Sequence, residues 1–212
     1  KSIPAQLKAA ARLDIPAIFI PGGSMRNGPE MTTSLKAGDI SLRQKREGAI
    51  TEQEIRDYKL TGCPSVGACT FLGTASTMQC MAEALGLALP GSALMPATMR
   101  DILSWARRAG RLIMKLVGEG ISASQIMTGK AFENAMIVHS AIGGSTNGVI
   151  HLTSIARELG IELLPEMFDE INHKVPHIGN ITPSGRHLTE AFWFAGGVPR
   201  VELELKDMLN LD

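Results

Sequence analysis

The segment TGCPSVGACTFLGTASTMQCMAEALGLAL, Thr61 to Leu89, is the part of the chain around which the fold is organised. It opens with a run of glycine, proline and serine that favours turns over regular structure. Beyond Cys69, apolar residues recur at helical spacing and predict an amphipathic helix. These residues are Met78, Met81, Ala82 and Leu85.

Cys69 is the first candidate functional residue, because it comes directly before this predicted helix. The first turn of a helix has unpaired backbone N–H groups and the positive end of the helix dipole, which together favour a thiolate. Cys69 is therefore a candidate metal ligand or nucleophile. The alternative is a buried cysteine that packs as a small apolar residue in a tight loop.

Composition limits the classes of protein to which the chain can belong. Its 212 residues include 21 basic and 21 acidic side chains, so no net charge directs it to nucleic acid or to an acidic membrane surface. Its apolar runs, such as 15–20, are too short to span a bilayer. Three cysteines and no signal-peptide pattern predict a reduced, cytoplasmic protein. The chain begins inside a helical pattern without a methionine, so we expect it to be a piece of a longer protein.

The segments before Thr61 predict an α/β fold. A helix to about Arg12 is followed by the continuous apolar run Ala17 to Ile20, which is typical of a strand buried on both faces of a parallel sheet. Thr51 and Glu54 form a capping box for a helix to about Leu60. Without an internal repeat or a low-complexity linker, residues 1–212 are interpreted as one domain.

Two glycine-containing loops are candidate substrate-site walls. Gly22, Gly23 and Ser24 follow the predicted strand at its C-terminal end, which is where open α/β sheets bind ligands. A plain connection between strand and helix is the alternative.

The second candidate loop is Ser145-Thr146-Asn147, which follows a pair of glycines and precedes a predicted helix at 149–159. Its backbone N–H groups and hydroxyls suit an oxyanion. An ordinary N-cap after a glycine hinge is the alternative.

The clearest helical pattern lies between 102 and 116, where one apolar stripe is flanked by basic residues that are interpreted as a solvated face. The stripe consists of Ile102, Trp105, Ala109, Leu112, Ile113 and Leu116. Further helices are expected at 131–140, 165–173 and 188–194, with an extended segment at 175–181.

Four segments in order resemble the dihydroxy-acid dehydratase and phosphogluconate dehydratase family, particularly its sugar-acid (aldonate) branch. The resemblance covers essentially the whole chain. The segments are KSIPA at 1–5, VGACTFLGTASTMQCMAEALGLALPGSA at 66–93, SAIGGSTNGVIHLTSIARELGIEL at 140–163 and AGGVPRVELEL at 195–205.

This resemblance implies part of an N-terminal, three-layer α/β/α domain with a mainly parallel sheet. It also implies an iron–sulphur dehydratase that removes water from a sugar acid to give a 2-keto-3-deoxy acid. Cys69 matches a ligand of the cluster, whose type (2Fe–2S or 4Fe–4S) is left open. Lys1 matches the lysine that, when carboxylated, ligates Mg²⁺. Cys63 and Cys80 match no ligand, and they are interpreted as a loop residue and as a core residue of the predicted helix, respectively.

The remaining ligands of the family pattern would lie before residue 1 and its catalytic serine after residue 212. We therefore expect this chain alone to be inactive, within a parent enzyme that forms a dimer or tetramer. Thr70-Phe71-Leu72 stands where the sugar-acid branch often has Asn-Thr-Met, which leaves the substrate open. The alternatives are a branched-chain dihydroxy-acid dehydratase and a truncated, non-catalytic binding module.

Overall fold

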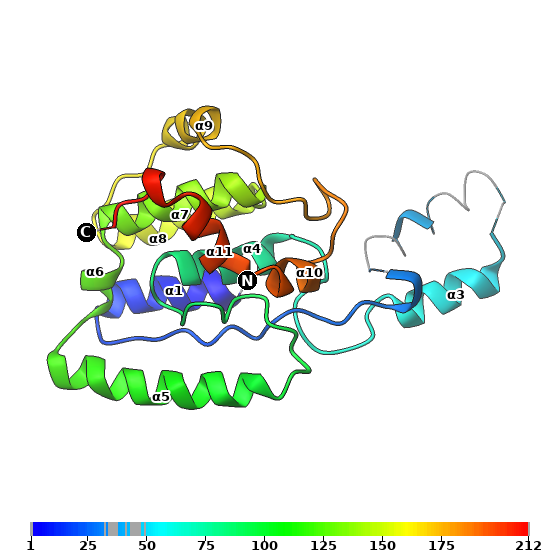
Figure 1. The fold of residues 1–212 in the computed structure, drawn as a ribbon, viewed down its shortest axis with the longest axis horizontal. Helices are drawn as coiled ribbons and strands as arrows, with labels where there is room; N and C mark the ends of the chain where they lie inside the picture. The colour runs from blue at the N-terminus through cyan, green and yellow to red at the C-terminus, as the bar shows by residue number, and fades with distance from the viewer. Residues whose placement is uncertain are drawn as a thin grey trace.

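The computed structural model describes residues 2–31, 33, 38–40, 42, 48 and 50–211, and this part of the chain is mainly helical (Figure 1). The longer helices are α1 (Ser2–Leu13), α3 (Glu52–Thr61), α4 (Thr74–Ala84), α5 (Asp101–Glu119), α7 (Gly129–Ile142), α8 (Asn147–Glu158), α9 (Pro165–Lys174) and α11 (Gly197–Glu204). The shorter ones are α6 (Ala123–Ile126), α10 (Thr189–Phe194) and the 3-10 turns Pro29–Met31 and Lys206–Met208.

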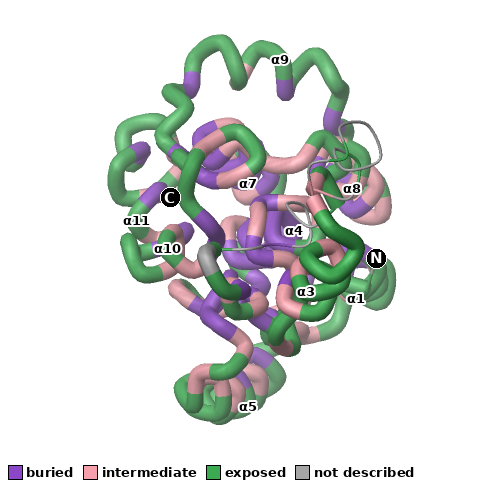
Figure 2. The backbone as a smooth tube through the Cα atoms, turned by 90° about the vertical axis from the view of Figure 1, so that its right-hand side faces the viewer, coloured by how far each residue is buried: buried purple, intermediate pink, exposed green. Residues whose placement is uncertain are grey.

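Helix α4 occupies the centre of the molecule, with α1, α7, α8 and α11 packed around it (Figures 1 and 2). Every residue from Ser76 to Glu83 is buried. The predicted amphipathic helix is therefore confirmed as a helix, but its polar face is buried as well. Cys80 lies in this core, as expected, and Phe132 of α7 is one of its largest fully buried side chains.

The predicted sheet is not formed among the described residues, where strand pairing is limited to isolated parallel bridges. Phe19 pairs with Ala88, and Ser24 pairs with both Ala68 and Pro96. The Ala17 to Ile20 run is extended, but it is only half-buried, and Ile20 is 46% exposed. Prolines on both sides of this short run leave room for a single bridge rather than a ladder. The prediction of a strand buried on both faces is thus wrong, while the parallel direction of the pairing is retained.

Local sequence signals for helix ends agree with the structure. The Thr51 side chain accepts a hydrogen bond from Glu54 N, and the Glu54 carboxylate accepts one from Thr51 N, so the predicted capping box is confirmed. Gly120 and Gly143 end α5 and α7 in the left-handed region, at φ +68° and +66°. Glycine suits these positions because it lacks the Cβ that penalises positive φ.

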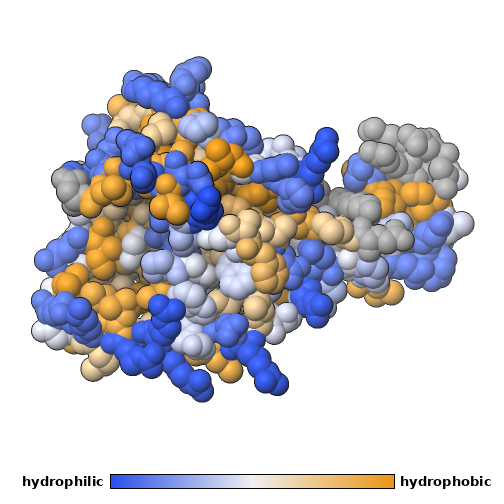
Figure 3. Space-filling model, viewed as in Figure 1, coloured by the Kyte–Doolittle hydropathy of each residue, from blue (hydrophilic) through white to orange (hydrophobic). Residues whose placement is uncertain are grey.

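Helix α5 lies at the edge of the molecule, away from the central helices (Figures 1 and 2). Its basic residues face solvent, as expected, yet only Ala109 and Leu116 of its apolar stripe are fully buried. Figure 3 shows apolar patches between the charged residues along this lower edge. In the described part of the chain, no helix combines the length and the apolar character that crossing a membrane requires.

Candidate active site

Cys69 follows Ala68 and lies five positions before Thr74, the first residue of α4. The Ser76 hydroxyl of α4 donates to the Cys69 carbonyl at 3.1 Å, which ties the cysteine to the first turns of the helix. Cys69 is a free, partly exposed thiol, whereas Cys63 is exposed. The third cysteine, Cys80, is buried, and burial raises the pKa of its thiol well above the usual value. Of the three, Cys69 alone is both partly exposed and hydrogen-bonded to the first turns of α4.

The first predicted substrate loop is held against α4 by a single side chain. Gln79 accepts a hydrogen bond from Gly23 N and donates one to Gly23 O, both at 3.0 Å. Gly23 has φ +77°, and a Cβ there would lie 2.1 Å from the Met95 carbonyl. Ser24 is fully buried, and its hydroxyl donates to Leu94 O at 2.9 Å. Gly22 is exposed, so of these three residues it alone presents its backbone to solvent.

The second predicted loop, 143–147, also rests on the N-terminal turns of α4. Thr77 Oγ1 accepts from Ser145 N at 3.0 Å, and the hydroxyls of Thr74 and Ser145 lie 3.2 Å apart. The Asn147 side-chain amide donates to Thr74 Oγ1 at 2.8 Å. The structure thus brings the Ser145–Asn147 loop to the same helix end as Cys69. Two helix N-termini, those of α4 and α8, meet there, and this arrangement favours an anionic group.

His139 supports the second loop from beneath. Its ring is buried against Phe168, with ring centroids 6.2 Å apart, and its Nε2 donates to Ser145 O at 2.9 Å. A Cβ at Gly144 would lie 2.4 Å from the ring and one at Gly148 2.6 Å from it, so both glycines make room for the imidazole. Burial lowers the pKa of His139, which keeps the ring neutral. The histidine is therefore a satisfied support for the loop.

Helix α10 joins the two strand-like segments next to Cys69, a connection that the sequence did not indicate. Thr70 O accepts hydrogen bonds from Thr189 N at 2.8 Å and from Thr189 Oγ1 at 3.0 Å. The Asn27 amide donates to the Glu190 carboxylate at 3.0 Å. Two buried oxygens, Asn27 Oδ1 and Thr70 Oγ1, have no hydrogen-bond partner. Residues far apart in sequence supply these contacts, and no short motif reveals them.

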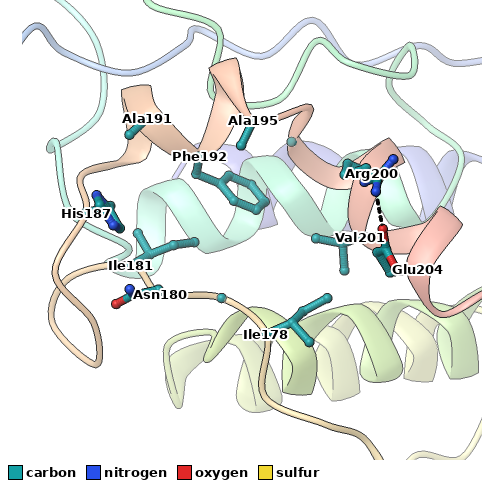
Figure 4. A pocket seen from close by; sticks show the side chains of 12 residues that line it. Ile178, Asn180, Ile181, His187, Ala191, Phe192, Ala195, Arg200, Val201 and Glu204 are labelled. Atoms are coloured by element: carbon teal, nitrogen blue, oxygen red, sulfur yellow. Dashed lines mark ion pairs between the residues drawn. The ribbon is translucent and has the colours of Figure 1, made fainter.

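A cavity of about 460 Å³ lies between the 178–181 segment, α10 and α11 (Figure 4). Its walls are mostly apolar, with Ile178, Ile181 and Phe192 pointing into the space, and an ion pair between Arg200 and Glu204 lies at one side. None of the predicted site residues lines it. The cavity is thus separate from the Cys69 region, although both adjoin α10.

The donors near Cys69 fit one ligand of an iron–sulphur cluster but not a complete set. Among the described residues, no group of three or more His, Cys, Asp or Glu side chains is placed to hold a metal ion. Cys63 and Cys80 do not complete a set with Cys69, and Lys1, the predicted Mg²⁺ ligand, lies outside the described residues. A single thiolate does not hold a cluster, which needs further cysteine ligands.

A family model and several relatives match this chain over all or nearly all of its length. The family model "Dihydroxy-acid/6-phosphogluconate dehydratase N-terminal" matches residues 1–212. A dihydroxy-acid dehydratase of Halothermothrix orenii is 42% identical over 216 residues, covering 100% of this chain and 39% of that protein. One of Thermodesulfovibrio yellowstonii is 44% identical over 212 residues, and one of Ignicoccus hospitalis is 44% identical over 208 residues.

The chain spans about two-fifths of the length of these relatives, 37–39% in the three cases. The family model and the Halothermothrix orenii protein match the whole chain. Both matches therefore include the Cys69 segment and the Ser145–Asn147 loop. The chain therefore belongs to the dihydroxy-acid/6-phosphogluconate dehydratase family, of which it represents the N-terminal region.

Proposed function

We propose that the full-length protein containing this chain is a hydro-lyase that removes water from a dihydroxy acid to give a 2-keto acid. Family membership across residues 1–212 supports a dehydratase. The relatives are named dihydroxy-acid dehydratases, which favours the branched-chain alternative over the sugar acid that the sequence pattern suggested. The sugar acid stays the second candidate because of the polar groups beside Cys69.

The observation that carries this proposal is that Cys69 and the loop of Ser145 and Asn147 are both hydrogen-bonded to the first turns of α4. In this proposal Cys69 is one ligand of an iron–sulphur cluster, whose other ligands lie outside the described residues. A bound cluster supplies a Lewis-acidic iron for a leaving hydroxyl. The protein's own contribution is positional: the two helix N-termini favour a carboxylate, and the hydroxyls of Thr74 and Ser145 orient its oxygens.

Several finer expectations accompany this proposal. They are a Mg²⁺ site that includes Lys1, a homo-oligomer in the cytoplasm, and a parallel sheet extended from the bridges at Phe19 and Ser24. The bridges support the sheet because all three of them run parallel. The chain of residues 1–212 by itself is proposed to be inactive, since it holds one candidate cluster ligand among its described residues.

The test is a comparison of Cys69→Ala with Cys63→Ala in the full-length protein, purified without oxygen. The visible absorption of thiolate-bound iron and the formation of 2-keto acid from 2,3-dihydroxy-3-methylbutanoate are measured together. Cys69→Ala is expected to lose both, whereas Cys63→Ala, at an exposed loop position, keeps both. If the cysteine-69 variant retained its colour and its turnover, Cys69 would not be a cluster ligand and the proposed site would be wrong.

A further inference from the structure

The apolar cavity beside α10 and α11 is surrounded by large apolar side chains that are open to solvent. The two helices lie side by side, and together with the 178–181 segment they enclose a space of about 460 Å³ (Figures 2 and 4). In these three elements, Phe194 is 66% exposed, Leu203 57% and Ile178 42%. An apolar hollow with exposed apolar residues around it is typical of a surface that binds another protein.

Phe194 and the cavity are neighbours on one helix. Helix α10 lines the cavity with Ala191 and Phe192, and Phe194 lies next to Ala191 because residues three apart are adjacent on a helix surface. Trp193 is turned elsewhere, since its Nε1 donates to Gly91 O at 2.9 Å. The Phe194 ring packs edge-on against the Trp193 ring, with centroids 5.0 Å apart. This contact holds a large aromatic group in solvent directly beside the hollow.

A projecting ring beside a hollow is a self-complementary arrangement. In a dimer with two-fold symmetry every contact is made twice, so a projecting group and the hollow that receives it belong to the same surface patch. Phe194 and the cavity meet this condition. A cavity of about 150 Å³ accepts a benzene-sized group, and the cavity here is larger. Two Phe194 rings can therefore enter two cavities reciprocally.

The charged pair at the side of the cavity is self-complementary as well. Arg200 and Glu204 lie one turn apart on α11 and form an ion pair within the helix (Figure 4). Their side chains are 59% and 51% exposed, so the pair stabilises the helix little and exchanges partners at little cost. Across a two-fold axis, Arg200 of one copy can face Glu204 of the second copy. This alternation of charge favours a second copy over an unrelated partner.

We propose that this surface is an interface between two copies of the protein, in which the Phe194 ring of each copy enters the cavity of the other. An aromatic side chain buries about 150–250 Å², so two rings and the walls that they cover account for about 600–1,000 Å². Leu203 and Ile178 extend this area towards the about 1,200 Å² of a small specific interface. The inference gives a surface to the homo-oligomer expected above and does not depend on the reaction.

The test measures the mass in solution of the full-length protein over a series of concentrations. Phe194→Ala removes the inserted ring and Ala191→Trp fills the cavity, so each should weaken association about a thousandfold, because the contact is lost twice. Leu103→Ala is the matched control, since Leu103 is 61% exposed on α5 and should leave association unchanged. An unchanged protein that never associates, or α10 variants that associate as strongly as it does, would overturn the interface.

A mixing experiment tests whether a second copy is the occupant. Arg200→Glu places two carboxylates beside each cavity and Glu204→Arg places two guanidinium groups there, so each variant alone should associate weakly. Mixed together, they should form heterodimers about as strong as the unchanged dimer, because opposite charges then face each other. Equal association of the separate and mixed variants would contradict this pairing.

The unfolding temperature separates this proposal from the remaining alternative. If Phe194→Ala lowered the unfolding temperature of the full-length protein but left its association unchanged, other parts of the same protein would cover the cavity, and the proposed interface would be wrong. The homo-oligomer would then use another surface. The dehydratase proposal is tested separately by the Cys69→Ala comparison, so the two can fail independently.

Discussion

Helices α4 and α5 differ in how well the apolar stripe in their sequence predicts which of their residues are buried. Helix α5 has the clearest apolar stripe in the chain, yet only Ala109 and Leu116 are fully buried. The stripe of α4 is weaker, and still every residue from Ser76 to Glu83 is buried. Periodicity therefore predicts that a helix forms and which side is apolar, but the packing of the rest of the chain determines how deeply it is buried.

The polar residues of α4 explain how a helix can be buried on all sides. Gln79 bonds to Gly23, Thr77 to Ser145, and Glu83 to the backbone N–H groups of Gly91 and Ala93 at 2.5 and 2.7 Å. Each of these side chains binds the backbone of a surrounding loop. Buried polar groups are tolerated when they are paired in this way, and here they also fix the loops of the candidate site.

The largest expected effect comes from a matched pair of methionines. Met81 of α4 is 0% exposed, and Met114 of α5 is 68% exposed. Met81→Ala leaves a cavity in the core and should reduce the free energy of unfolding by about 2–5 kcal/mol. Met114→Ala should change it by less than about 0.5 kcal/mol. Denaturant titration of both variants measures the difference, and similar losses would mean that α5 is packed more tightly than its exposure indicates.

The pH dependence of stability should reflect Glu83, because burial raises the pKa of its carboxyl to about 7. Burial also raises the pKa of Glu202 in α11 to about 7. The Glu202 carboxylate raises the pKa of Glu83 further, because it repels the charged form of Glu83. A raised pKa means that the folded state holds the proton more tightly than the unfolded chain. This stabilisation is complete below about pH 4.5 and is lost as the pH rises through 7.

The free energy of unfolding is accordingly expected to fall by up to about 3 kcal/mol between pH 5 and pH 8. Glu83→Gln should reduce this slope, since an amide does not titrate there, and the contribution of Glu202 should remain. Glu158 does not interfere in this window, because hydrogen bonds from Arg12 and Lys8 lower its pKa to about 2. A slope equal in the Gln variant and the unchanged protein would show that Glu83 is not the titrating group.

The next effect tests the loop contact of α4. Gln79→Ala removes both hydrogen bonds to Gly23 and leaves its buried N–H group unpaired, while its carbonyl keeps the hydrogen bond from Ala68 N. The substitution should cost about 1–3 kcal/mol of stability. Gln53 of α3 provides the control, because its exposed amide donates only to Asp57 within the same helix. Gln53→Ala is expected to change stability by less than about 0.5 kcal/mol. Equal effects of the two substitutions would contradict a structural role for the Gln79 contact.

Features that depend on contacts between residues close in sequence could be predicted, whereas features that depend on contacts between distant residues could not. The capping box at Thr51 and the apolar stripe of α5 involve residues a few positions apart, and both predictions are confirmed. Cys80 was also correctly expected in the core. The predicted sheet is reduced to isolated parallel bridges among the described residues, because the apolar run at 17–20 carries no information on whether neighbours cover both of its faces.

The candidate site also depends on contacts between residues that are far apart in the sequence. The Cys69 segment and the Ser145 loop were recognised separately, but their meeting at α4 depends on Thr74 and Thr77, more than 60 residues away from the loop. The roles of Cys69 as a cluster ligand and of Lys1 as a metal ligand stay predictions. The unpaired Thr70 hydroxyl was missed because an unmade hydrogen bond leaves no mark in a sequence.

The smallest expected effect concerns two glycines of α5, and it tests whether local propensity rather than packing supports this helix. Gly118 lies within α5, and Gly120 ends it at φ +68°; a Cβ at either position would meet no atom within 4 Å. Gly118→Ala should stabilise the protein by about 0.5–1 kcal/mol, because alanine loses less backbone freedom on folding. Gly120→Ala should destabilise it by about 1 kcal/mol, because an L-residue is strained at positive φ.

Since both sites are open, packing contributes to neither change, and opposite signs in the same denaturant titration would isolate the backbone contribution. An equal loss in the two variants would indicate instead that neighbouring chain covers this turn of α5. In that case the contrast with α4 would be one of degree, because both helices would then depend on contacts with the rest of the protein.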